Sequence, residues 1–331
     1  MNRGPLRRAT VMASVLGLGA LAALAAIVFL PVNRRPFFHD GAEKLLDYDE
    51  AVKAIKALAA AAPATVRRKC TLQLLEHGRP TKRVFVLLHG LSNCPAQFSE
   101  LGRQLFERGH NVLIPLLPYH GEEDRLATEW GGLTGDSMLE AGNVAADLAR
   151  SLGENVIVAG LSINGATVAW MAQNRKDLYK AVLLAPFFAP FNLPDLAFLP
   201  TERLLLRLPN MFFWWDPRQR ENVVGPAYAY PRFPTRVIGE TMFLGRAVLD
   251  ESRVFPPQCP WILAITTASD TAANNVVTEQ LITNWRALRP AGIQTFEFPA
   301  DEQIPHDFID PNQPNQQIDI VYPKLIELLE K

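Results

Sequence analysis

The fold is indicated by one ten-residue stretch, Val156-Ile157-Val158-Ala159-Gly160-Leu161-Ser162-Ile163-Asn164-Gly165. Its first four residues are apolar and predict a strand buried on both faces, and an amphipathic helix is predicted to start just beyond Ser162. A serine at such a strand-to-helix turn has its hydroxyl exposed at the tip of a sharp, strained bend, the arrangement called a nucleophile elbow. The helix N-terminus also stabilises negative charge on an attacked carbonyl. Ser162 is therefore the predicted nucleophile.

The stretch departs from the G-x-S-x-G pattern at one position. Residues two before and two after the serine approach neighbouring backbone, so the turn needs small side chains there. Gly160 meets this requirement, whereas position 164 is Asn, although Gly165 follows it. Asn adopts unusual backbone angles more readily than most residues, which keeps the elbow the preferred interpretation. The alternative is that Ser162 only caps the helix.

A second buried strand runs directly into a loop, in the stretch Val84-Phe85-Val86-Leu87-Leu88-His89-Gly90-Leu91-Ser92-Asn93. One backbone N–H of such a loop completes an oxyanion hole together with the N–H of the residue that follows the nucleophile. We assign these two N–H groups to Leu91 and Ile163. His89 is expected to shape the loop, with Gly90 beside it, rather than to act as a base.

The other catalytic groups follow from chain order, which in this kind of site runs serine, acid, histidine. Of the six His, only His306 lies downstream of Ser162, in a loop just after the last strand-like segment. Asp270 follows the preceding strand-like segment and is the expected acid, holding the correct tautomer of His306 and stabilising its imidazolium. The alternatives are a solvated loop histidine and a helix-capping aspartate. The fallback acids are Asp250 and Asp301.

Outward from the elbow, short apolar strands alternate with longer helices. This alternation predicts βαβ units and an α/β fold with a mostly parallel sheet. Gly109 and Gly153 are expected to end two of the helices. The predicted strands are 70–75, 84–88, 112–114, 156–159, 181–185, 261–267 and 295–298. The predicted helices are 49–62, 96–108, 136–152, 163–176, 275–288 and 318–329.

Residues 187–257 interrupt the alternation. The segment holds many of the Pro residues and several aromatic residues, and it separates two predicted strands. An insertion there covers the carboxyl ends of the strands, where open α/β sheets bind ligands, and its aromatic residues favour an apolar ligand group. We therefore expect a core made of 84–186 and 258–331, a leading helix and strand at 36–83, and a cap or lid at 187–257.

The N-terminal segment, residues 1–35, is expected to lie outside the globular core. Residues 10–30 carry no charge, and as a helix they are about 31 Å long, enough to cross a hydrocarbon core. Three Arg precede them and two follow, which favours a cytoplasmic N-terminus and an exported remainder. A retained single-pass membrane anchor is preferred, because the apolar run exceeds the usual length in a signal peptide. Secretion after signal cleavage is the alternative.

Composition excludes several classes of protein. The 331 residues include 33 Lys and Arg against 34 Asp and Glu, without the basic excess of a nucleic-acid binder. Residues 1–35 hold five Arg and no acid, so the near-neutral total combines a basic tail with a mildly acidic remainder. Three Cys are too few for a disulfide scaffold, and no His or Cys cluster has the spacing of a metal site. A disulfide of Cys94 with Cys70 or Cys259 is left open.

Together these motifs resemble the α/β-hydrolase superfamily of serine hydrolases, from about residue 84 to the C-terminus. The resemblance rests on Leu87-Leu88-His89-Gly90, Gly160-Leu161-Ser162, Asp270 and His306, which stand in the family order. The segment Leu116-Leu117-Pro118-Tyr119-His120-Gly121 is similar to the "PGHG" loop of the carboxylesterase, monoacylglycerol lipase and lysophospholipase branch. The resemblance implies the α/β-hydrolase fold, a cap over the pocket, and hydrolysis of acyl esters with neither a metal nor an organic cofactor.

The expected activity is hydrolysis of small-molecule or lipid carboxylic esters with an apolar acyl or aryl group, through an acyl-enzyme. Two rivals share the fold, namely a thioesterase and an S33-like peptidase acting on N-terminal residues. Such a peptidase needs a cap acid for the substrate amine, and the candidates are Glu202, Glu221 and Glu240. A rival of another class is a membrane-anchored binding protein with a decayed site, which Asn164 suggests. The natural substrate and the oligomeric state stay open.

Overall fold

The computed structural model describes residues 45–220 and 224–331, together with residues 19, 30, 32 and 37–39. The expected membrane segment at 10–30 lies outside the described residues except at positions 19 and 30. Its two interpretations, as an anchor and as a signal peptide, therefore stay predictions. Within the described part of the chain, no helix is both long enough and apolar enough to span a membrane.

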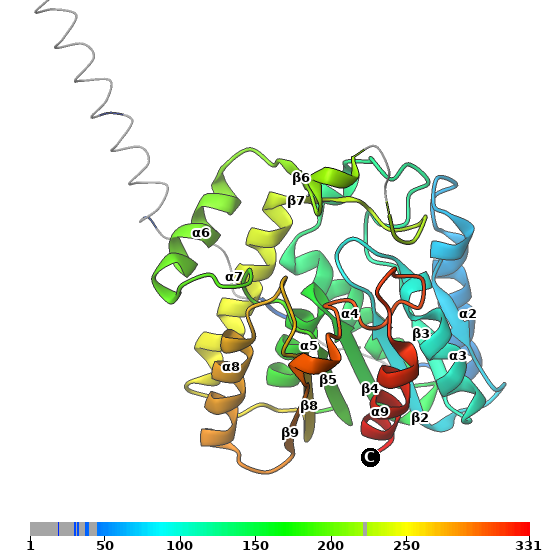
Figure 1. The fold of residues 1–331 in the computed structure, drawn as a ribbon. Helices are drawn as coiled ribbons and strands as arrows, with labels where there is room; N and C mark the ends of the chain where they lie inside the picture. Colours follow the sequence, from blue (N-terminus) through cyan, green and yellow to red (C-terminus); the bar gives the residue numbers. More distant parts are fainter. Residues whose placement is uncertain (1–18, 20–29, 31, 33–36, 40–44, 221–223) are drawn as a thin grey trace, which may run out of the picture.

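A seven-stranded sheet forms the centre of the described part (Figure 1). Its strand order is β1-β3-β2-β4-β5-β8-β9, and every neighbouring pair is parallel except β1 with β3. Leu88 at the end of β2 pairs with Gly160 near the end of β4, so the loops that carry the two motifs leave the same edge of the sheet. The strand bounds are β1 (Gln73–Leu75), β2 (Thr81–Leu88), β3 (Asn111–Ile114), β4 (Gly153–Leu161), β5 (Lys180–Leu184), β8 (Trp261–Thr267) and β9 (Ile293–Phe298).

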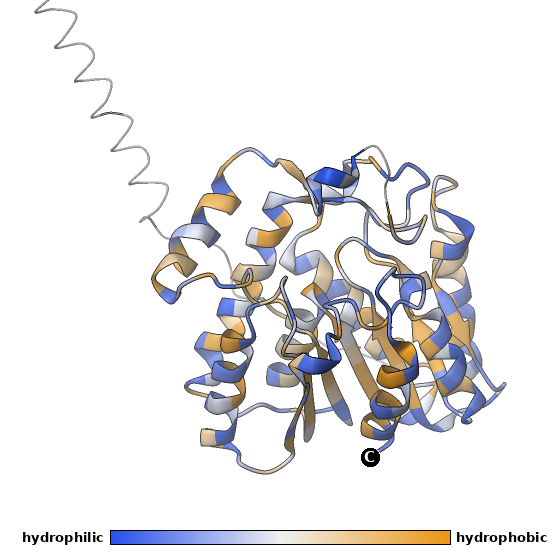
Figure 2. Ribbon diagram, viewed as in Figure 1, coloured by the Kyte–Doolittle hydropathy of each residue, from blue (hydrophilic) through white to orange (hydrophobic). Residues whose placement is uncertain are grey.

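Helices cover both faces of this sheet (Figure 1), which confirms the predicted α/β fold with a mostly parallel sheet. Val84 and Val86 of β2 pack in one buried cluster with α2, α4, α5 and α8, whereas Phe85 packs in another with α3 and α9. Figure 2 shows that hydrophobic residues predominate in the central strands, whereas hydrophilic and hydrophobic residues alternate along the helices. The helix bounds are α2 (Tyr48–Ala60), α3 (Ser99–Glu107), α4 (Gly135–Ala149), α5 (Ile163–Asn174), α8 (Asn275–Leu288) and α9 (Ile318–Glu330).

The segment between β5 and β8 adds two strands and two helices. Strands β6 (Phe212–Trp214) and β7 (Arg232–Pro234) pair antiparallel and lie beyond the carboxyl ends of the central strands (Figure 1). Helix α6 (Asp195–Arg207) packs against α7 (Thr235–Ser252). Because α7 also packs against α5 and α8, it belongs to the helix layer on the sheet as well as to the insertion.

The predicted elements differ from the observed ones at two places near the start of the sheet. The predicted strand 70–75 begins only at Gln73, because residues 68–70 form a 3-10 turn. The predicted helix 96–108 is divided, since a 3-10 turn at Pro95–Phe98 precedes α3. Three further 3-10 turns lie at Glu129–Gly132, Pro217–Gln219 and Ala300–Glu302.

The two glycines that were expected to end helices behave differently. Gly109 follows α3 with a φ of +88°, as a glycine after a helix C-terminus does. Gly153 does not end the helix predicted at 136–152, and this prediction was wrong. It is the first residue of β4, where an added Cβ would lie 2.9 Å from the carbonyl oxygen of Thr81. The glycine is therefore needed for close strand packing rather than for a helix cap.

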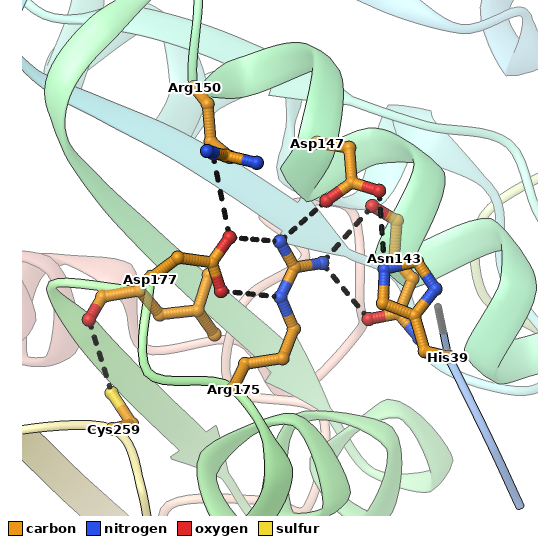
Figure 3. A network of polar contacts seen from close by, with 8 residues as sticks. His39, Asn143, Asp147, Arg150, Arg175, Asp177 and Cys259 are labelled. Atoms are coloured by element: carbon orange, nitrogen blue, oxygen red, sulfur yellow. Dashed lines mark hydrogen bonds and ion pairs between the residues drawn. The ribbon is translucent and has the colours of Figure 1, made fainter. Parts of the chain in front are cut away.

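A buried ionic cluster closes the C-terminal end of α5 (Figure 3). The guanidinium of Arg175, of which only 5% is exposed, donates to both carboxylate oxygens of Asp177, at 3.0 and 2.6 Å. It also donates to Asp147 at 2.5 Å and to the side-chain oxygen of Asn143 at 3.0 Å. All three nitrogen atoms of Arg175 are thus hydrogen-bonded, and Arg150 adds an ion pair to Asp177.

Candidate active site

The strand-to-helix turn after β4 has the geometry of a nucleophile elbow. Ser162 lies between β4 and α5 with φ +59° and ψ −117°, a left-handed backbone that non-glycine residues rarely adopt. A Cβ added to Gly160 would lie 2.3 Å from the carbonyl oxygen of Asn164, and one added to Gly165 would lie 2.5 Å from Cα of Pro186. The bend therefore requires glycine at 160 and 165, while position 164 has room for a side chain.

Asn164 uses that room to join the elbow to the neighbouring strand. Its side chain is fully buried, and Nδ2 donates a hydrogen bond of 2.6 Å to the backbone carbonyl of His89, just beyond β2. Its Oδ1 is buried and accepts no hydrogen bond from the described residues. The departure from the G-x-S-x-G pattern thus places a cross-link between the elbow and the loop after β2.

The structure brings Ser162, His306 and Asp270 into one chain of contacts. Oγ of Ser162 lies 2.9 Å from Nε2 of His306, and Nδ1 of His306 lies 2.7 Å from Oδ2 of Asp270. A carboxylate accepts, so the imidazole proton belongs on Nδ1, and the lone pair of Nε2 faces the serine hydroxyl. This is the arrangement in which an imidazole accepts the proton of an attacking serine.

Asp270 is held as an anion. Burial alone would raise the pKa of this carboxyl, but its hydrogen bond and electrostatic attraction to His306, together with two backbone N–H donors, outweigh burial. The backbone N–H groups of Ala272 and Ala273 also donate to its Oδ1, at 2.7 and 2.9 Å. The pKa of Asp270 is therefore lowered below its usual value, and the carboxylate is charged at neutral pH.

Neither fallback acid lies in this chain of contacts. Asp250 is on the surface of α7, where it pairs with Arg246 and Arg253. Asp301 is exposed in the 3-10 turn at Ala300–Glu302. Asp270 is the carboxylate that contacts His306.

The two N–H groups expected to form an oxyanion hole belong to residues on the wall that carries Ser162. Ile163 is the first residue of α5, and N–H groups in the first turn of a helix have no acceptor within the helix. Leu91 lies in the loop after β2, and both residues line the same cavity as Ser162.

Two buried histidines hold the loop that carries Leu91. His89 accepts from the N–H of Leu117 through Nε2 at 3.2 Å, so its proton is on Nδ1, which donates to the carbonyl of Gly90 at 2.9 Å. Burial, together with nearby His120, lowers the pKa of His89 to about 3, so it stays neutral. His120 places Nε2 2.7 Å from the carbonyl of Leu91. His89 thus joins the loop after β2 to the segment around Leu117.

Sequence reasoning missed a side-chain bridge between this loop and the histidine loop. The N–H of Gly90 donates to Oε1 of Gln97 at 2.8 Å, and Nε2 of Gln97 donates to Asp307 at 2.9 Å. Amide groups of Asn93 and Gln313 donate to the same carboxylate oxygen, at 3.2 and 2.8 Å. Asp307, the residue after His306, thereby ties the base to the loop that carries Leu91.

Of the two disulfide pairings left open for Cys94, the structure shows the one with Cys70. Their sulfur atoms are bonded, and Cys259 is a free, buried thiol. Cys94 lies between Leu91 and the 3-10 turn at Pro95–Phe98, so the bond ties the loop to the segment before β1.

Ser162 and His306 open onto a cavity of about 780 Å³ between the core and the insertion. Side chains from both parts of the chain line it, and the insertion contributes aromatic residues that include Phe187, Phe191, Trp214, Trp215 and Phe233. Among the described residues, no group of three or more His, Cys, Asp or Glu is placed to hold a metal ion.

A family described as "Alpha/beta hydrolase family" matches residues 85–323. The chain belongs to this family. No curated protein matches the sequence. One similar solved structure comes from a report on LipS and LipT, two metagenome-derived lipolytic enzymes, at 16% identity and a TM-score of 0.59, over 80% of this chain and 99% of that one.

Two further similar structures belong to a monoacylglycerol lipase and a monoglyceride lipase. The monoacylglycerol lipase of Paleococcus ferrophilus has 16% identity and a TM-score of 0.59, over 78% of this chain and 97% of that one. The monoglyceride lipase of Saccharomyces cerevisiae has 13% identity and a TM-score of 0.58, over 78% and 91%. At these identities the likeness establishes the shared fold.

Proposed function

We propose that the protein is a serine hydrolase that cleaves carboxylic esters through an acyl-enzyme on Ser162. The observation that carries this proposal is the Ser162–His306–Asp270 contact chain at the wall of an apolar cavity. The family and its lipase and esterase neighbours support the same reaction class. The aromatic walls favour an apolar acyl or aryl group.

In the proposed reaction His306 takes the proton of Ser162 as its Oγ attacks the ester carbonyl. The N–H groups of Leu91 and Ile163 stabilise the oxyanion, each worth about 3–4 kcal/mol. His306 then protonates the leaving alcohol, and water hydrolyses the acyl-enzyme by the same route. Asp270 keeps the proton of the imidazole on Nδ1 and stabilises the imidazolium.

Among the described residues, the peptidase rival lacks a supporting contact. Glu202 pairs with Arg246, and Glu240 accepts from the N–H of Gly135, so neither of these acids lines the cavity. Glu221 lies outside the described residues. Asn164, the reason for suspecting a decayed site, is accommodated by its bond to the carbonyl of His89.

We also propose that residues 10–30 anchor the protein in a membrane, with a cytoplasmic N-terminus and the catalytic domain on the other side; secretion after cleavage is the alternative. The disulfide between Cys70 and Cys94 supports an oxidising compartment for the catalytic domain. Fractionation separates the two alternatives, because an anchored protein sediments with membranes and keeps its full mass.

The esterase proposal is tested with a fluorophosphonate probe, which labels an activated serine. The wild type is expected to be labelled and Ser162→Ala to be unlabelled. Ser92→Ala is the control, because Ser92 lies on the same cavity wall and should leave labelling intact. Equal labelling of the wild type and Ser162→Ala contradicts the assignment. Turnover of dipeptide amides without turnover of any p-nitrophenyl ester contradicts the esterase reaction.

A further inference from the structure

One arginine lines the cavity without a counter-ion. Arg125 lies in the loop between β3 and the 3-10 turn at Glu129–Gly132, and among the described residues that line the cavity it is the only Arg or Lys. Its Nε donates a hydrogen bond of 2.7 Å to the carbonyl of Ala229, in the insertion. The guanidinium is thus fixed where the core loop meets the insertion.

The two terminal amino groups of Arg125 are free to bind a ligand. No described residue accepts a hydrogen bond from them, and Arg125 forms no ion pair within the described part of the chain. Burial and the like charge of Arg67 lower the pKa of Arg125, but a guanidinium stays protonated at any physiological pH. A half-buried cation of this kind is stabilised when an anion supplies the missing acceptors.

The carboxylates on the cavity wall are already engaged. Asp216 pairs with Arg218, with an Nε–Oδ1 distance of 2.9 Å. Asp307 accepts hydrogen bonds from three side-chain amides, so it is held within the bridge between the loops. The cavity therefore combines an apolar wall, the Ser162 hydroxyl and one cation whose terminal amino groups have no partner among the described residues.

We infer that the substrate is an ester that also carries an anionic group, a carboxylate or a phosphate, which Arg125 binds while Ser162 attacks the ester carbonyl. The planar guanidinium fork suits both anions, because each offers two oxygens to two N–H donors. This inference rests on the proposed esterase function and adds a substrate class to it.

The inference is tested with two substrates that differ only at the far end of the acyl chain, the mono-p-nitrophenyl ester of glutaric acid and p-nitrophenyl valerate. At pH 7 the first carries a carboxylate where the second has a methyl group. We expect the wild type to favour the glutarate ester by about tenfold or more in kcat/KM, mainly through KM, as for a hydrogen bond to a charged group. Salt at 0.5 M should reduce this ratio by screening.

Matched variants attribute the preference to Arg125. Arg125→Gln is expected to bring the ratio near one, whereas Arg125→Lys keeps the charge without the fork and should give an intermediate ratio. Arg103→Gln removes an arginine from the surface of α3, outside the cavity, and should leave the ratio at its wild-type value. A preference that survives Arg125→Gln overturns the inference.

A second substrate pair asks whether the anion belongs to the alcohol side. Lysophosphatidic acid and the monoacylglycerol with the same acyl chain differ by the phosphate alone. If the enzyme discriminates within this pair but not within the first, the anion belongs to the leaving alcohol. If it discriminates within the first pair but not within this one, the anion belongs to the acyl group. If the wild type shows kcat/KM ratios near one in both substrate pairs, the inference is wrong, and this result does not depend on whether Arg125→Gln folds. Hydrolysis of p-nitrophenyl valerate would in that case still support the esterase proposal. If none of the four esters is hydrolysed, both proposals fail.

Discussion

The two ends of helix α5 differ in how fully their polar side chains are hydrogen-bonded within the protein. At the N-terminal end, Ser162 has a left-handed backbone, and its hydroxyl contacts His306 at the wall of the cavity. At the C-terminal end, Arg175 has every nitrogen hydrogen-bonded within a buried cluster (Figure 3). One helix thus begins at the proposed nucleophile and ends at an arginine whose guanidinium is fully hydrogen-bonded.

The contacts around Ser162 show how the fold holds a strained backbone in place. A backbone such as that of Ser162 costs of order 1–3 kcal/mol and persists only if its surroundings determine it. The N–H of Ser162 donates to Leu184 at 2.9 Å, and its carbonyl accepts from Gly165 and Phe187 at 2.8 and 2.9 Å. These bonds fix the bend while leaving the hydroxyl for chemistry. The cluster at the other end leaves no free donor on the guanidinium.

The sharpest way to test this division is to change one aspartate at each end to asparagine. Asp270→Asn presents an N–H to Nδ1 of His306, which favours the tautomer with the proton on Nε2 and removes the acceptor for the serine proton. We expect kcat on p-nitrophenyl esters to fall about 10⁴-fold, with the fold intact by circular dichroism.

The control is Asp177→Asn, which weakens the Arg175 cluster at the other end of α5. It should lower the melting temperature and leave kcat near the wild-type value. If Asp270→Asn reduced kcat by less than tenfold, Asp270 would not be the residue that orients His306.

The strand-to-helix turn at Ser162 can be predicted from sequence because all of its residues lie within one short stretch. The apolar run of β4, the small residue at Gly160 and the helix after Ser162 lie within one stretch, so periodicity and residue size indicate the turn without tertiary information. Chain order then leaves His306 as the candidate base, and the strand pattern favours Asp270 as the acid, with Asp250 and Asp301 as fallbacks. The parallel sheet follows likewise from short apolar strands that alternate with helices.

The contacts that hold the candidate site together join residues far apart in the sequence, so no local pattern predicts them. Gln97 and Asp307 are 210 residues apart, and nothing in either segment indicates that the amide of one meets the carboxylate of the other. Asn164 looks like a defect in the motif until its bond to the carbonyl of His89 is seen. The partner of Cys94 also depends on which loops meet, because neither Cys70 nor Cys259 is favoured by spacing. These contacts are set by how the elements pack.

A smaller effect, on stability alone, is expected when Arg175 at the C-terminal end of α5 is replaced. Arg175→Met leaves Asp147 and Asp177 without their buried cation, which should lower the free energy of unfolding by about 3–5 kcal/mol. Denaturant titration measures this loss, and kcat per folded molecule should stay unchanged. Arg103→Met, on the exposed surface of α3, is the control and should change stability too little to resolve. An Arg175→Met protein as stable as the wild type would show that the cluster contributes nothing.

The smallest expected effect compares two buried asparagines that each make a side-chain bond near an end of α5. Asn164 donates to the carbonyl of His89 at the elbow, and Asn143 of α4 accepts from Arg175 in the cluster. Truncation to alanine removes the donor to the buried carbonyl of His89 in one case, and in the other leaves Nη1 of Arg175 with only its longer bond to the backbone carbonyl of residue 143. Each variant should therefore lose about 1–3 kcal/mol of stability. Equilibrium unfolding of the two variants under the same conditions measures this cost.

Activity separates the two asparagines. Asn164→Ala frees the strand end that positions Leu91, so kcat/KM on p-nitrophenyl esters should fall about tenfold, the loss expected from roughly 1.4 kcal/mol of transition-state stabilisation. Asn143→Ala should keep the wild-type value when rates are corrected for the folded fraction. If both variants lost activity in proportion to stability, Asn164 would be a packing residue that happens to lie beside the elbow. If only Asn164→Ala lost activity, the departure from the glycine pattern would be part of how the site is aligned.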